Sequence, residues 1–177
     1  GDYPIPDAVK QSAATVDPEA LFSLTEDLYR LVRAVAPLAD MESTDGTLKL
    51  TADCGPIQFD TKLELSNLQT ASGSVDPEKL RALPEILGWL CMEGNISCTL
   101  QNNAYVYVLA LDQRSMQELA GMLLPELAQY SKNLTEGSVT ILLENGRILS
   151  MHVSISGKIS ALITQIPIAV DAEFSFN

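Results

Sequence analysis

The chain has 177 residues, with 23 Asp or Glu against 11 Lys or Arg, so its formal net charge at pH 7 is −12. Apolar residues make up 46% of it, which is too many for a disordered chain. The acidic excess argues against binding to nucleic acid and against electrostatic adsorption to an anionic bilayer, because both depend on Lys and Arg. The length predicts one domain.

The first fifteen residues carry no periodic apolar pattern and contain Pro4 and Pro6 among small polar residues. Such a segment is typical of a flexible tether, as between a membrane anchor and a folded domain. It holds no charged segment followed by an apolar stretch, so we expect any targeting signal to have been removed. We expect a tether over residues 1–15 and a single folded domain over residues 16–177.

The first predicted helix begins where Asp17 can cap it and Pro18 can occupy its first position. Pro37 ends it, and two alternating segments, 47–51 and 57–65, then predict a pair of strands. The apolar stripe of the helix repeats at three- and four-residue steps and consists of Leu21, Leu24, Leu28, Leu31 and Val35.

The second predicted helix begins with the same sequence, Val-Asp-Pro-Glu, at residues 75–78. Pro84 and Gly88 should weaken or kink it. Two further strands are predicted over 96–100 and 105–109. The stripe of this helix consists of Leu80, Leu83, Leu87 and Leu90.

The third predicted helix runs from about residue 112 to residue 131. Ser115 and Glu118 have the spacing of a capping box, and Pro125 predicts a kink. Its apolar stripe consists of Met116, Leu119, Leu123, Leu127 and Tyr130.

The last part of the chain predicts long antiparallel strands. The Asn145-Gly146 pair lies between alternating apolar segments and predicts a hairpin, because both residues tolerate positive φ. Gly157-Lys158 is expected to turn the chain again into a final strand, in which Pro167 predicts an edge position or a bulge. The three strands are expected over 139–144, 147–156 and 159–176.

These elements predict an α+β fold in which a curved antiparallel sheet, an incomplete barrel, wraps about three amphipathic helices. Each helix precedes a hairpin, so one interpretation is a helix-hairpin repeat over 16–67, 75–111 and 112–157. Residues 16–31 and 75–90 align without gaps. The other interpretation is that helix starts of this type and leucine stripes arise independently.

The residues that could carry chemistry form no recognisable catalytic or metal-binding motif. His152, the one histidine, falls on the polar face of an amphipathic strand. Asp40, Glu42 and Asp45 lack the spacing of a calcium-binding loop and favour a solvated connector. We therefore expect no enzymatic activity, no cofactor and no metal. A hydrolase with a carboxylate pair is disfavoured because no base or nucleophile accompanies it.

Three cysteines, Cys54, Cys91 and Cys98, follow no metal-binding spacing. They are interpreted as small buried side chains, with a single disulfide as the alternative.

The apolar excess gathers on one face of the last strands. That face is either a plain core or the wall of a cavity that holds an apolar ligand. Trp89, on the second predicted helix, is either a core anchor or part of a ligand pocket. The candidate ligand-binding residues are Trp89, Met151, Val153, Ile155, Ile166, Ile168, Val170 and Phe174.

Residues 112–177 carry a resemblance to a known family. The order of an amphipathic helix, the segment from Gly137 to Ile148 and two long strands resembles bacterial envelope lipoproteins with the LolA/LppX-like fold. The resemblance implies an incomplete barrel around helices, an extracytoplasmic location, and lipids or lipid anchors carried in the concavity. The chain departs from the family in lacking its lipidated N-terminal cysteine.

The leading functional hypothesis is a monomeric, membrane-anchored envelope domain that binds a lipid or another apolar small molecule without catalysis. It would contact the membrane only through an anchor that has been removed, and would bind no nucleic acid. A cytoplasmic location is the alternative to the envelope. The alternative function is a structural or protein-interaction module of the cell surface, with a filled core and no ligand.

Overall fold

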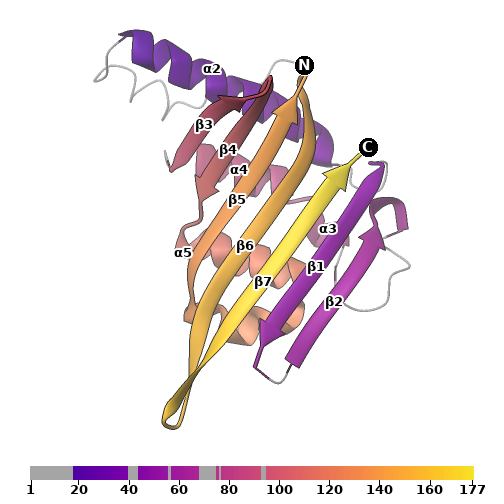
Figure 1. The fold of residues 1–177 in the computed structure, drawn as a ribbon, viewed down its shortest axis with the longest axis vertical. Coiled ribbons are helices and arrows are strands. Elements are labelled where there is room, and N and C mark those ends of the chain that lie inside the picture. The colour runs from indigo at the N-terminus through magenta and orange to yellow at the C-terminus, as the bar shows by residue number, and fades with distance from the viewer. Residues whose placement is uncertain (1–17, 40–43, 56, 68–74, 76, 93–94) are drawn as a thin grey trace.

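The computed structural model describes residues 18–39, 44–55, 57–67, 75, 77–92 and 95–177. Its main feature is one open antiparallel sheet of seven strands, in the order β2-β1-β7-β6-β5-β4-β3 (Figure 1). The predicted tether over residues 1–15, and Asp40 and Glu42, lie outside the described residues. The strands are β1 (Gly46–Cys54), β2 (Ile57–Glu64), β3 (Ile96–Gln101), β4 (Ala104–Ala110), β5 (Leu134–Glu144), β6 (Arg147–Ala161) and β7 (Thr164–Phe176).

Four α-helices pack against one face of this sheet, so the predicted α+β class is confirmed. They are α2 (Pro18–Val35), α3 (Pro77–Leu80), α4 (Leu83–Met92) and α5 (Gln113–Leu123). Within the described residues, three 3₁₀ helices accompany them: η1 (Ala36–Ala39), η3 (Leu65–Asn67) and η4 (Pro125–Asn133).

Proline explains where the helices differ from the three that were predicted. The second predicted helix is broken into α3 and α4, and Pro84 takes the second position of α4, where its missing N–H costs no hydrogen bond. The third ends at Leu123, and Pro125 starts η4. Its N-cap is Asp112, whose carboxylate accepts a hydrogen bond from the Ser115 backbone N–H (2.8 Å), so the predicted capping box at Ser115 is wrong.

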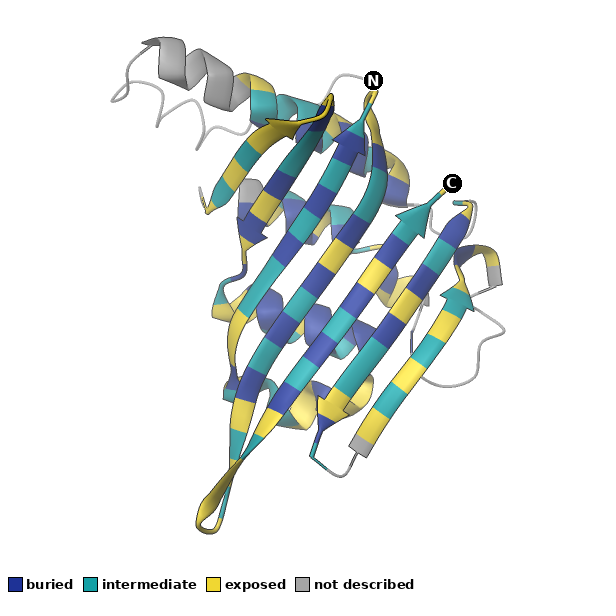
Figure 2. Ribbon diagram, in the orientation of Figure 1, coloured by how far each residue is buried: buried dark blue, intermediate teal, exposed yellow. Residues whose placement is uncertain are grey.

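Buried residues alternate along the strands with residues that are half-buried or exposed, as Figure 2 shows. Along β6, Met151, Val153 and Ile155 are buried, whereas His152 is exposed. The helices cover the inner face, and their leucines join those of the strands in one core cluster. This cluster fixes the position of the whole helical layer.

The predicted turn at Gly157-Lys158 is wrong, because β6 continues to Ala161 and the chain turns at Leu162 and Ile163. Glycine is needed at position 157 because the backbone of β6 passes close to the backbone at Asn133. A Cβ atom there would lie 1.9 Å from the carbonyl oxygen of Asn133, where η4 enters β5.

The hairpin of β6 and β7 extends beyond its neighbouring strands. Pairing of β5 with β6 reaches Gly157, and pairing of β1 with β7 reaches Ile168. Residues 158–167 therefore form a two-stranded ribbon, and Pro167 lies where β7 has lost its second neighbour. Its position at a local edge agrees with the sequence-based expectation.

Each helical segment precedes a hairpin, in the order α2 then β1–β2, α3 and α4 then β3–β4, and α5 with η4 then β5–β6. A true duplication remains a prediction. In the described part of the chain, no helix has the length and apolar character needed to cross a membrane.

The close approach at Gly157 gives a first prediction. Gly157→Ala should destabilise the protein by about 1–3 kcal/mol, because the added carbon overlaps the backbone at Asn133. Gly121→Ala is the matched control: nothing lies within 4 Å of a Cβ at that position, and alanine favours a helix interior by about 1 kcal/mol. Urea unfolding of both variants measures the difference, and equal stability would contradict the close approach.

Candidate functional site

Six of the sequence-predicted ligand-binding residues lie in the packed core. Their exposed fractions are 0–1%, and they contact the side chains that the helices contribute to the same cluster. These residues are Met151, Val153, Ile155, Ile168, Val170 and Phe174. Ile166 is half-buried on the two-stranded ribbon, away from them along β7. The structure therefore does not bring Trp89 together with the other seven.

Trp89 instead lines a groove within the helical layer. The groove lies between α2, α4 and α5 and has a volume of about 530 Å³. We call it the Trp89 groove. It is lined by Val32, Ala82, Glu85, Ile86, Gly88, Trp89, Arg114, Ser115 and Glu118.

A smaller hollow of about 170 Å³ adjoins the groove and shares Val32 and Gly88 with it. Its remaining lining is apolar and comes from α2, the start of η1, and α4: Leu31, Val35, Ala36, Pro84 and Leu87. The two spaces follow the seam between α2 and α4, which is therefore an apolar channel with one wider end.

Gly88 keeps this seam open. It lies in α4 between the buried Leu87 and the partly exposed Trp89, and no atom lies within 4 Å of where its Cβ would be. A glycine inside a helix costs about 1 kcal/mol relative to alanine, and here no neighbouring atom requires it. The residue thus lowers helix stability while it widens the groove.

One carboxylate joins the two helices at the wide end of the groove. Asp112, just after β4, caps α5 through Ser115 and also accepts a hydrogen bond from the Trp89 indole N–H (3.2 Å). Hydrogen bonds from the Ser115 side chain and backbone lower the pKa of the Asp112 carboxyl, and the indole adds to this effect against a small opposing contribution from burial. Asp112 therefore fixes the orientation of the indole ring.

The rim of the Trp89 groove carries charges of both signs. The Arg114 guanidinium lies 5.2 Å from the centre of the Trp89 ring and pairs with Glu118, with 3.0 Å between Nε and Oε1. Glu85 lines the same rim and is exposed. The lining thus combines apolar sides with a charged rim, an arrangement that can hold an apolar body with a polar end.

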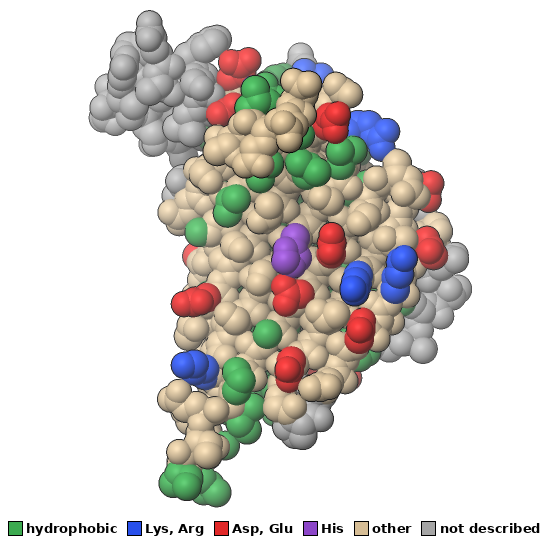
Figure 3. Space-filling view, in the orientation of Figure 1, with side chains coloured by type: hydrophobic (Ala, Val, Ile, Leu, Met, Phe, Trp, Pro, Cys, Tyr) green, Lys and Arg blue, Asp and Glu red, His purple; other side chains and the backbone are tan. Residues whose placement is uncertain are grey.

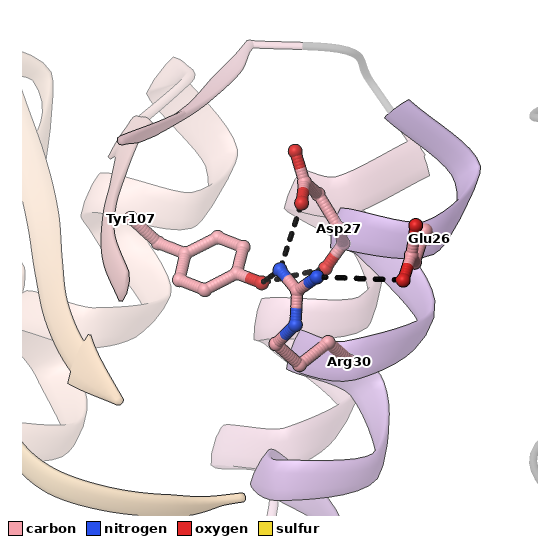
Figure 4. A network of polar contacts seen from close by, with 4 residues as sticks. All are labelled: Glu26, Asp27, Arg30 and Tyr107. Atoms are coloured by element: carbon pink, nitrogen blue, oxygen red, sulfur yellow. Dashed lines mark hydrogen bonds and ion pairs between the residues drawn. The ribbon is translucent and has the colours of Figure 1, made fainter. Parts of the chain in front are cut away.

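A second polar network ties α2 to the sheet (Figure 4). The Arg30 guanidinium contacts Asp27 Oδ1 (2.7 Å) and donates to the Tyr107 hydroxyl (3.0 Å). It also stacks over the Tyr105 ring at 3.7 Å. The Tyr107 hydroxyl in turn donates to the Asp27 carbonyl oxygen at 2.8 Å.

Burial and hydrogen bonding shift the acid–base equilibria of this network. Desolvation alone would lower the pKa of Arg30, but hydrogen bonds from it to Asp27 and Tyr107 outweigh that effect and raise the pKa. Burial raises the pKa of the Tyr107 hydroxyl despite its bond to Arg30. Burial, followed by the charge of Asp27, raises the pKa of the Cys98 thiol. All three groups therefore keep their protons at neutral pH, which suits a structural tie.

The remaining titratable candidates lie apart from the groove. His152 is exposed on the outer face of the sheet, where Nε2 lies 2.9 Å from Asp171 Oδ1. Cys54 and Cys98 are free thiols. Among the described residues, no group of three or more His, Cys, Asp or Glu side chains could hold a metal ion.

Comparison of the chain with protein-family models, with curated proteins and with solved structures finds no match. The Trp89 groove is therefore the feature of the molecule from which a function can be proposed.

Sequence reasoning selected Trp89 and missed the other lining residues. The signal that could have found them is Gly88 inside a leucine-rich helix, next to the only tryptophan. A glycine in the interior of a helix, where no turn requires it, indicates a place where a larger side chain would occupy needed space.

Replacement of the shared cap gives a second prediction. Asp112→Ala should lower stability by about 1 kcal/mol at neutral pH, because α5 loses its cap, and should shift the emission of Trp89. Asp112→Asn can still cap and is the control. Since the pKa of Asp112 is lower in the folded state, the wild-type advantage is complete above about pH 4 and is lost as pH falls through the folded-state value. Urea unfolding followed by Trp89 fluorescence at several pH values measures this.

The tie between α2 and β4 gives a third prediction. Tyr107→Phe removes one hydroxyl that accepts from Arg30 and donates to the Asp27 carbonyl oxygen. It should cost about 1–3 kcal/mol, because two partly buried hydrogen bonds are lost, one of them with a charged group. Thermal or urea unfolding measures this loss. The control is Tyr130→Phe, which removes a tyrosine hydroxyl from η4, outside the network. A loss no larger than that of the control would show that the network contributes little.

Proposed function

We propose that this protein is a non-enzymatic binding protein that holds a small apolar or amphipathic molecule in the Trp89 groove. The observation that supports the proposal is the groove itself, with Val32, Ile86 and Trp89 on its sides and a glycine at its centre. Its volume of about 530 Å³ falls within the range of roughly 300–1,000 Å³ that is common for small-molecule sites.

The charges around the groove restrict the ligand. One arginine and two glutamates form the rim, and the whole chain carries a net charge of −12. An anionic ligand would therefore approach against the field of the protein. The ligand class that fits is a neutral, zwitterionic or cationic molecule with an acyl chain or a ring, whose apolar part lies along the seam between α2 and α4.

The location remains the one that the resemblance to envelope lipoproteins implies, outside the cytoplasmic membrane, with the protein as a monomer. In this proposal the ligand occupies the helical layer rather than the space between sheet and helices, because Met151, Val153 and Ile155 already fill that space.

The packed core also favours a second candidate, a protein-interaction module without a ligand. Residues with 0–1% exposure under the helices are what a purely structural domain requires. The two candidates differ in what the Trp89 groove does: in the second it would be an unfilled surface feature, with no preference for apolar molecules.

A matched pair of glycine variants separates these candidates and is our fourth prediction. Gly88→Phe places a ring in the seam, where a Cβ atom meets nothing within 4 Å, and should lower the affinity for the neutral apolar dye Nile red by about tenfold or more. Gly121→Phe adds the same side chain to open space on α5, outside the groove lining, and should bind like the wild type.

Fluorescence titration measures the dye, circular dichroism confirms that both variants fold, and native mass spectrometry examines co-purified lipid. If the wild type binds no dye and carries no ligand, or if both variants bind equally well, the groove is not a binding site. The interaction module would then be the better account.

A further inference from the structure

The end of the β6–β7 hairpin is the most apolar exposed point in the described part of the molecule. The two-stranded ribbon of residues 158–167 extends past the neighbouring strands and ends at Leu162 and Ile163, as Figure 1 shows at the bottom of the view. We call these two residues the hairpin tip. Their exposed fractions are 106% and 99%, against 63% for Leu100, the next most exposed large apolar residue.

The conformation of the tip adds a second observation. Leu162 has φ of 53°, in the left-handed region, where a leucine is disfavoured and glycine is preferred. The other three hairpins use suitable residues for positive φ, namely Gly55, the Asn102-Asn103 pair and the Asn145-Gly146 pair. Among the described residues, only the β6–β7 hairpin thus has an apolar residue at the positive-φ position of its turn. This residue exposes apolar surface and strains the local backbone.

The charge pattern of the hairpin is the third observation. Between Glu144 and Asp171 the sequence contains no acidic residue, although the whole chain has 23. The charged side chains in this stretch are Arg147 and Lys158, and Lys158 is exposed at the base of the ribbon. The net negative charge of the protein therefore does not extend to the tip. Figure 3 shows the apolar end with one basic side chain above it.

We propose that the hairpin tip inserts Leu162 and Ile163 into the surface of a lipid bilayer with neutral headgroups. The tip is convex and has only two side chains, so it would need a preformed pocket on a protein partner, whereas a fluid bilayer adapts around it. The long Lys158 side chain can keep its ammonium group in the headgroup region while the ribbon enters. The tip is separate from the Trp89 groove, and the proposal does not depend on ligand binding there.

Sedimentation with vesicles tests the proposal on the full chain. The wild type should bind to phosphatidylcholine vesicles, and more weakly to phosphatidylglycerol vesicles at low salt, because the net charge of −12 opposes approach to an anionic surface. The double variant Leu162→Gly with Ile163→Ser places glycine at the positive-φ position. It should bind at least about tenfold more weakly to phosphatidylcholine, since two aliphatic side chains are lost.

Two controls make the result specific to the tip. Leu100→Ser removes an exposed leucine from the β3–β4 hairpin and should leave vesicle binding unchanged. The double variant should unfold at the same or a higher temperature than the wild type, because glycine relieves the strain at Leu162. A loss of binding therefore cannot be attributed to unfolding.

Three outcomes would overturn the proposal. The first is a wild-type chain that does not bind phosphatidylcholine vesicles, and the second is a double variant that binds as well as the wild type. The third is wild-type self-association on gel filtration that the double variant abolishes together with sedimentation, which would assign the tip to a second copy of the chain instead.

Discussion

The inner face of the seven-stranded sheet must be shielded from water, and the rest of the structure depends on how three separate parts of the chain achieve this. Alternate residues of β1 and of the long strands β5–β7 form the face, and α2, α4 and α5 cover it. Burial of apolar surface at roughly 25 cal/mol per Å² is the largest favourable contribution to such a fold. With that face covered, a groove of about 530 Å³ lies between the helices, at Gly88 and Trp89.

Two polar ties hold the helices at the positions that leave this space. Asp112 connects the start of α5 to the indole of Trp89 on α4, and Arg30 connects α2 to Tyr107 on β4. In the described part of the chain every buried side-chain nitrogen or oxygen has a hydrogen-bond partner. The groove is therefore a preorganised gap between fixed helices, and a ligand would not need to separate them in order to enter.

Sequence reasoning predicted the α+β class, the order of helices and hairpins and the Asn145-Gly146 turn, because these depend on local periodicity and turn chemistry. It failed at Gly157, since the contact that requires glycine comes from Asn133, far away in sequence. It also left open whether Met151 and its neighbours form a plain core or the wall of a ligand cavity. Alternation reveals that one face of a strand is apolar, but not whether a helix already covers it. Trp89 was left open as a core anchor or a pocket residue, and its ligand-binding role stays a prediction; the structure places it on the groove beside Gly88.

The proposed ligand site lies between α2 and α4 and not between the sheet and the helices. Methyl NMR during titration with Nile red tests this most directly, because both places contain assignable methyl groups. The account predicts that the largest shift changes occur at Val32 and Ile86, with small changes at Val153, Ile155 and Val170. Largest changes at those three core residues would contradict it and would place the ligand under the sheet.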